Sequence, residues 1–270
     1  MRLVIEPGLA SANYWRDLWR YRELMYFLAW RDIVVRYKQT VIGVAWALVR
    51  PALTMVVFVL FRRLMGNPQS AIPDPILVLA AVLPWQFFSS ALQDAAGSLI
   101  ANANLVSKVY FPRLIVPFAA VVTAVADFAV TLGLLAALMA WYGVAPGPSL
   151  LALPLFALLA AALAMGIGLL VAALNVSYRD FRYVVPFMMQ IALFVSPIAF
   201  TTSAMPEPWR SFYVFNPLVG IIDGFRWAIL GDAAPVMPDA VLTSVVMTVL
   251  SLVVGVWYFR RTERGFADVI

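Results

Sequence analysis

Residues 149–174 read SLLALPLFALLAAALAMGIGLLVAAL, a run without one charged side chain. A helix needs roughly 20 mostly apolar residues to cross a bilayer, so this stretch predicts a membrane-spanning helix. Five further windows are apolar over a similar length: 42–61, 76–98, 114–142, 184–203 and 240–259. The sequence therefore predicts an all-α integral membrane protein with six transmembrane helices, forming a single domain over residues 1–270.

Composition supports this fold class and excludes several kinds of chemistry. The chain is 64% hydrophobic and 12% charged, whereas soluble domains are roughly 45–50% apolar and about 25% charged. Cysteine and histidine are absent, which excludes disulfides, thiol catalysis, imidazole bases and zinc sites of Cys and His. No GxxxxGK[ST] phosphate loop occurs, so ATP binding by a Walker motif is not expected in this chain.

The distribution of positive charge predicts the orientation. Cytoplasmic loops of membrane proteins are enriched in Lys and Arg. Most of the nineteen Lys and Arg residues fall on the side that carries both termini. Only Arg62, Arg63, Arg210 and Arg226 fall on the other side. Both termini, including a tail at 260–270, are therefore expected in the cytoplasm, and no cleavable signal sequence precedes the first apolar run.

The segment 11–41 is amphipathic. Trp15, Trp19, Tyr26 and Trp30 recur at helical spacing, and basic residues fall mostly on another face. A basic helix with aromatic residues on its apolar side suits the membrane interface. The pattern predicts an interfacial helix, acting either as a plain anchor or as the border of a substrate entrance.

Residues 204–239 are too charged and too rich in proline for a full span. Asn216 and Pro217 predict a helix start, with Asn as the N-cap and Pro in the first turn. The pattern predicts two short helices that enter the outer leaflet and return. Non-helical backbone at that depth is tolerated only against protein or a water-filled cavity, which implies a pore or vestibule nearby. An amphipathic loop lying on the bilayer is the alternative. The residues assigned to this outer gate are Trp209, Phe215, Asn216, Pro217, Asp223 and Arg226.

Two aromatic and polar stripes are candidate channel linings. The stripe of the first window comprises Trp46, Arg50, Thr54 and Phe58, and that of the fifth comprises Phe187, Gln190, Phe194 and Ser196. Stripes of this kind can provide weak, repeated contacts along a path through the membrane. Such stripes also occur in ordinary packing or facing lipid. Polar groups at depth, such as Arg50 and Gln190, usually face a bundle interior or water.

Charged residues inside the predicted spans need partners or water. At 1.5 Å per residue, Arg50 and Asp94 lie at similar depth in the cytoplasmic half, and Asp127 lies nearer the outer half. We therefore predict an Arg50–Asp94 ion pair, with Asp127 facing a helix interface or the aqueous path. The alternative is that Arg50 extends unpaired to the cytoplasmic headgroups.

Four stretches together resemble one family: RDIVVRYKQTVIGVAWALVRPALTMVVFVLF (31–61), NANLVSKVYFPRLIVP (102–117), NVSYRDFRYVVPFMMQIALFVSPIAF (175–200) and FNPLVGIIDGFRWAILG (215–231). They resemble the membrane permease subunits of type-2 ABC exporters for bacterial polysaccharides such as O-antigen, capsule or teichoic acid. The resemblance implies a homodimer in the bacterial inner membrane, bound to two copies of a cytoplasmic ATPase that carries the ATP and magnesium. It implies as substrate a glycan attached to a polyprenyl-diphosphate lipid, and it implies no nucleic acid.

The cytoplasmic loops are the candidate contacts with that ATPase. Aromatic residues among basic ones suit insertion into a groove of a partner, although an ordinary positive loop has the same composition. The residues assigned to coupling are Asn104, Lys108, Tyr110, Arg113, Arg179, Asp180 and Arg182. Two other functions remain open: a type-2 permease for a drug or lipid, and a membrane-embedded lipid-phosphate glycosyltransferase. The scarcity of acidic residues in the cytoplasmic loops argues against the enzyme.

Overall fold

The computed structural model describes residues 10–38, 43–64, 72–178, 180–202, 206 and 209–266, and within these ranges the regular secondary structure is entirely helical. The N-terminal segment forms two helices, α1 (Ala10–Arg20) and α2 (Arg22–Lys38), where the sequence predicted one. The long helices that follow are α3 (Gly43–Leu64), α4 (Asp74–Ala101), α6 (Ile115–Tyr142), α7 (Leu153–Ser177) and α11 (Pro238–Thr262).

Five helical segments in the described ranges are long and apolar enough to cross a membrane. They coincide with five of the six predicted windows to within a few residues. The window 184–203 differs, because its helix, α8 (Phe181–Val195), has only 15 residues. The helix ends where Ser196 adopts an extended conformation, as expected for a residue that precedes a proline.

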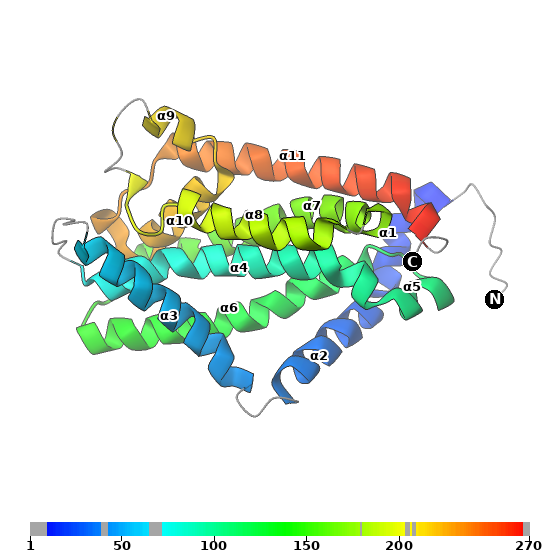
Figure 1. Ribbon diagram of the computed structural model, residues 1–270, viewed down its shortest axis with the longest axis horizontal. Helices are drawn as coiled ribbons and strands as arrows, with labels where there is room; N and C mark the ends of the chain where they lie inside the picture. The colour runs from blue at the N-terminus through cyan, green and yellow to red at the C-terminus, as the bar shows by residue number, and fades with distance from the viewer. Residues whose placement is uncertain are drawn as a thin grey trace.

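The long helices run roughly along one axis, and the short elements lie at the two ends (Figure 1). The short helix α5 (Ala103–Lys108), helix α1 and the C-terminal end of α11 lie at one end of the molecule. The opposite end carries α9 (Trp209–Tyr213) and α10 (Pro217–Leu230). Helices α2 and α3 diverge from the bundle and form a V in this view.

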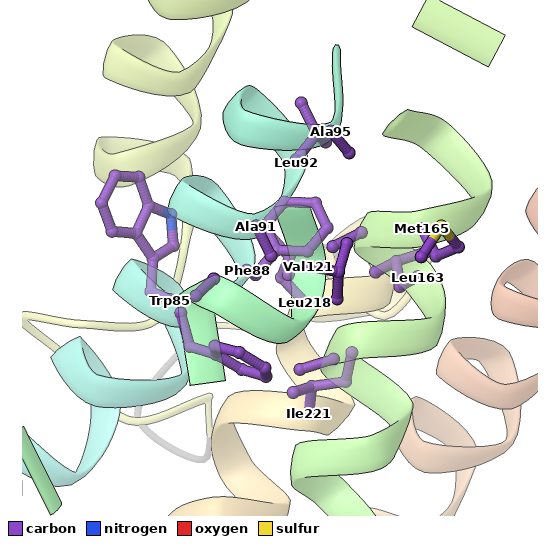
Figure 2. Packing of buried hydrophobic residues seen from close by; sticks show 14 of the residues in the cluster. Trp85, Phe88, Ala91, Leu92, Ala95, Val121, Leu163, Met165, Leu218 and Ile221 are labelled. Carbon is purple, nitrogen blue, oxygen red and sulfur yellow. The ribbon is translucent and has the colours of Figure 1, made fainter. Parts of the chain in front are cut away.

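Helix α4 is the centre of the bundle. It packs mainly against α6 and α7, and α7 packs in turn against α11. Figure 2 shows how its apolar residues meet those of three neighbouring helices. The labelled members are Trp85, Phe88, Ala91, Leu92 and Ala95 of α4, Val121 of α6, Leu163 and Met165 of α7, and Leu218 and Ile221 of α10.

Helices α3, α8 and α11 are peripheral. Each exposes large apolar side chains, among them Leu53 of α3, Phe194 of α8 and Val253 of α11. In water such surfaces would be costly, at roughly 25 cal/mol for each Å² left exposed. Lipid or another protein chain must therefore cover these faces.

Candidate functional site

A non-helical segment after α8 is held by two arginines from other helices. The Arg226 guanidinium of α10 donates to the carbonyl oxygens of Ile198 at 2.9 Å and Phe200 at 3.1 Å. Arg62 of α3 donates to the carbonyl oxygen of Ala199 at 3.0 Å. Buried backbone groups without partners are costly. The two guanidiniums thus replace the helical hydrogen bonds that this segment lacks.

Both arginines of this clamp are buried and have carboxylate partners. Arg226 is 1% exposed and lies 3.7 Å from Asp223 on the same helix. Arg62 is 6% exposed and lies 3.2 Å from Asp74 at the start of α4. A buried cation is tolerated when it is paired and hydrogen-bonded in this way.

Local sequence explains why α10 can present Arg226. The side chain of Asn216 accepts a hydrogen bond from the amide of Leu218 at 3.0 Å, and Pro217 is the first helical residue, so the predicted helix start is confirmed. Gly224 allows α10 to approach α7 closely, since a Cβ there would meet the Phe156 ring at 2.1 Å.

Four of the six residues assigned to the outer gate fall into two groups, and Asn216 and Pro217 are half-buried at the start of α10. Trp209 and Phe215 are exposed, whereas Asp223 and Arg226 are buried in the clamp. The hydroxyl of Tyr213, from α9, also donates to the carbonyl oxygen of Val195 at the end of α8. The short helices and the end of α8 are therefore joined through backbone carbonyls of residues 195–200.

A polar cavity of about 640 Å³ lies among α2, α3, α4 and α6. Its lining includes Trp46 and Arg50, two of the residues assigned to the channel. The complete lining is Arg36, Tyr37, Trp46, Ala47, Arg50, Pro51, Leu83, Gln86, Phe87, Ser90, Gln93, Asp94, Ala124, Asp127, Phe128 and Thr131.

Arg36 bridges two carboxylates in this cavity. It lies 2.8 Å from Asp94 of α4 and 2.5 Å from Asp127 of α6. Tyr37 also donates to Asp127. Burial raises the pKa of the Tyr37 phenol, and its hydrogen bond to Asp127 acts in the same direction. This network attaches the C-terminal turn of α2 to two spans.

The predicted Arg50–Asp94 pair is corrected by this network. Asp94 pairs with Arg36, and no ion pair of Arg50 occurs in the described part of the chain. Arg50 nevertheless lines the same cavity. The depth argument considered only residues of the spans, whereas the cation comes from α2. It also placed Asp127 farther out than Asp94, whereas one guanidinium contacts both carboxylates. The sequence did contain a signal: Asp94 and Asp127 are two acidic residues inside predicted spans, so a second cation near them was to be expected.

The two predicted channel stripes meet at one point. Phe58 of α3 and Phe194 of α8 lie with ring centroids 6.5 Å apart. On α3, Trp46 and Arg50 are exposed while Thr54 accepts a hydrogen bond from Gln86 of α4 at 3.2 Å. The α8 stripe keeps Phe187, Gln190 and Phe194 exposed, but Ser196 is buried and bonds back to the carbonyl of Ala192 at 2.7 Å. Whether these faces line a channel stays a prediction.

Helix α5, which carries Asn104 and Lys108, and the start of α8, which carries Arg182, lie at the same end of the molecule (Figure 1). The short helix predicted there is present as α5, and its Asn104 and Lys108 are exposed. Tyr110, Asp180 and Arg182 are exposed too, and Arg179 lies outside the described residues. Arg113 is partly buried, with its guanidinium 5.9 Å from the centre of the Phe266 ring.

Two contacts that sequence reasoning missed connect the N-terminal helices to this end. Arg31 of α2 donates to the side-chain oxygen of Asn102, between α4 and α5, at 2.8 Å. Tyr14 of α1 donates to Glu263 at 2.9 Å. Burial and the neighbouring Glu263 carboxylate raise the pKa of the Tyr14 phenol above its usual range. No sequence signal pairs residues so distant along the chain.

A bundle of apolar helices with polar helix-to-helix networks and peripheral apolar faces defines a multi-pass membrane protein. Residues 23–230 match the ABC-2 type transporter family, and the chain belongs to this family.

The relatives of this chain are similar to it over almost its full length. The O-antigen export system permease protein RfbA of Myxococcus xanthus is 28% identical over 262 residues, which cover 94% of this chain and 98% of the relative. RfbA of Klebsiella pneumoniae is 26% identical, covering 92% and 95%. The polysialic acid transport protein KpsM of Escherichia coli is 24% identical, covering 87% and 92%.

Proposed function

We propose that this chain is the membrane permease of an ATP-driven exporter that moves a lipid-linked polysaccharide of the O-antigen or capsule type across the bacterial inner membrane. The observation that carries the proposal is the similarity to O-antigen and polysialic acid export proteins over nearly the whole chain. The chain would perform no covalent chemistry itself. The same similarity favours a glycan over a drug as the substrate.

A separate ATPase subunit would supply the energy. The sequence lacks a Walker phosphate loop, which supports assignment of ATP and magnesium to a partner. The side chains of Asn104, Lys108 and Tyr110 are exposed and would form part of the surface that binds the ATPase. Two ATPase copies would bind one permease dimer, which we infer from the resemblance in the sequence.

Six crossings would place both termini in the cytoplasm. Helix α8 rises only about 22 Å at 1.5 Å per residue, against a hydrocarbon core of about 30 Å. The carbonyl-clamped segment after α8 would complete this crossing, because its backbone hydrogen bonds are supplied by arginine side chains. Helices α9 and α10 would then form a re-entrant gate on the outer side.

The translocation path would run along the face shared by α3 and α8. The exposed residues Phe187, Gln190 and Phe194 support this assignment, since their side chains do not pack in the core of their own subunit. A second copy of the chain across that face would enclose a path with aromatic and polar walls. The interfacial helices α1 and α2 would border its cytoplasmic entrance.

A complementation experiment tests the proposed function. The gene is deleted in its host, and surface polysaccharide is measured by gel staining of envelope extracts and by surface immunolabelling. The expected result is loss of the surface glycan with accumulation of the lipid-linked form inside, and recovery when the gene is restored. An unchanged surface glycan in the deletion strain would refute the proposal.

A further inference from the structure

The cavity among α2, α3, α4 and α6 has the composition of a carbohydrate site. We propose that it binds an uncharged sugar unit of the exported glycan, an inference that rests on the proposed function. Its α3 wall includes Trp46 and Arg50 of the stripe assigned to the translocation path, whereas its other walls come from α2, α4 and α6. Its volume of about 640 Å³ falls in the range of roughly 300–1,000 Å³ common to small-molecule sites.

The charge balance of the cavity favours a neutral ligand. Its wall carries two guanidiniums, Arg36 and Arg50, and two carboxylates, Asp94 and Asp127. Arg36 lies between both carboxylates, so a phosphate group approaching it would meet two negative charges at hydrogen-bond range. Like charges at that distance repel strongly in a partly desolvated site. An uncharged ligand with hydroxyl groups is not repelled by these carboxylates.

The polar groups of the wall can serve hydroxyl groups as both donors and acceptors. The side chains of Asp94 and Asp127 remain 32% and 27% exposed in their ion pairs, so carboxylate lone pairs stay accessible. The Gln93 amide nitrogen donates to Ser89 at 2.9 Å, which leaves its oxygen as an acceptor. The Arg50 guanidinium supplies donors only.

An aromatic wall completes the arrangement. The Trp46 indole is 58% exposed and belongs to the lining. Aromatic rings offer large apolar surfaces with a negative face, which suits the C–H face of a sugar ring. Carboxylates, amides and an open indole around one cavity therefore match the mixed polar and apolar surface of a sugar better than they match an acyl chain.

The cavity also lies where an arriving glycan could reach it. Asp94 is seven residues from the α5 end of α4, about 10 Å along the axis. Helix α2 touches that same end through the hydrogen bond between Arg31 and Asn102. The site would therefore hold a sugar on the cytoplasmic half of the membrane, before the glycan enters the path between subunits.

A cysteine-protection experiment on the assembled transporter tests this site. The chain has no cysteine, so Ser90→Cys places a single thiol in the cavity wall. The permease and its ATPase are reconstituted in nanodiscs, and the rate of maleimide labelling is measured. The probe is lipid-free polysaccharide released by mild acid from the host envelope. We expect it to slow labelling about tenfold, equivalent to roughly 1.4 kcal/mol.

Three comparisons give the result its meaning. Labelling of Ser107→Cys, on the exposed side of α5, should not change with the polysaccharide. Inorganic diphosphate should not protect Ser90→Cys, and protection by it alone would overturn the proposal in favour of an anion site. Adding Trp46→Ala or Gln93→Ala should restore fast labelling in the presence of polysaccharide, and undiminished protection in both would overturn it too.

Failure of this inference can be told apart from failure of the proposed function. If the restored gene brings back surface glycan but polysaccharide does not protect Ser90→Cys, the sugar site is wrong and the export function stands. If deleting the gene leaves surface glycan unchanged, the export function itself is wrong.

Discussion

At the scale of single residues, Arg226 is the side chain whose loss we expect to be most damaging. Its removal leaves the carbonyls of Ile198 and Phe200 without their donor and Asp223 without its cation. Breaking a buried pair on one side costs about 3–5 kcal/mol. Arg226→Ala should therefore lower the melting temperature of the detergent-purified chain clearly. Arg63→Ala, an exposed neighbour of the clamp residue Arg62, is the control and should leave it unchanged. Equal melting temperatures for both variants would contradict the clamp.

The partner of Asp94 can be decided by comparing two double-mutant cycles. Arg36 lies 2.8 Å from Asp94, so Arg36→Ala and Asp94→Ala should be non-additive in unfolding stability by at least about 0.5 kcal/mol. The cycle of Arg50→Ala with Asp94→Ala should be additive within roughly 0.3–0.5 kcal/mol. Strong coupling in the second cycle and none in the first would support the Arg50–Asp94 pair predicted from the sequence over the Arg36–Asp94 pair of the structure.

Residue-scale prediction from sequence succeeded where the rule is local. The cap at Asn216 and the proline at 217 depend only on adjacent residues, and both are confirmed. The placement of Arg36 was missed because it depends on how α2 docks against α4 and α6. Helical periodicity identifies the faces of a helix, but it does not say which other helix a face will meet.

At the scale of elements, α5 is the part of the chain we expect the ATPase to touch. Lys108 is exposed at its last turn, whereas Arg113 is partly buried beside Phe266. Lys108→Glu should therefore reduce ATPase co-purification and leave thermal stability unchanged, while Arg113→Glu should lower both. Arg16→Glu, an exposed charge reversal on α1, is the control. Normal co-purification and export in the Lys108→Glu variant would remove α5 from the interface.

Spans proved easier to predict than the segments that interrupt them. Five windows agree with long helices because a run of about 20 apolar residues has few alternatives. The end of α8 was missed because the apolar pattern continues to residue 203. The dipeptide Ser196-Pro197 was the available signal, since proline makes the helical conformation unfavourable for the residue before it. The arginines that make this break tolerable come from α3 and α10, which no local pattern could reveal.

At the scale of the whole molecule, the number of crossings decides where the C-terminus lies. If α8 and its clamped extension cross the membrane, the count is six and both termini share one side. If they do not cross, the count is five, and Arg260, Arg261 and Arg264 would lie outside, against the usual enrichment of basic residues in the cytoplasm. The arrangement in Figure 1 favours six, because α9 and α10 lie at the opposite end from α5.

Because the chain has no cysteine, single introduced cysteines can show directly whether the number of crossings is five or six. Trp209→Cys lies on α9, and Arg264→Cys lies just beyond α11; both positions are exposed. A membrane-impermeant maleimide added to intact spheroplasts should label position 209 and leave position 264 unlabelled until the membrane is opened. Lys108→Cys on α5, at the same end of the molecule as the C-terminal end of α11 (Figure 1), is the control and should behave as position 264 does. Labelling of position 264 from outside, with position 209 protected, would mean that α8 turns back before crossing and that the proposed gate faces the cytoplasm.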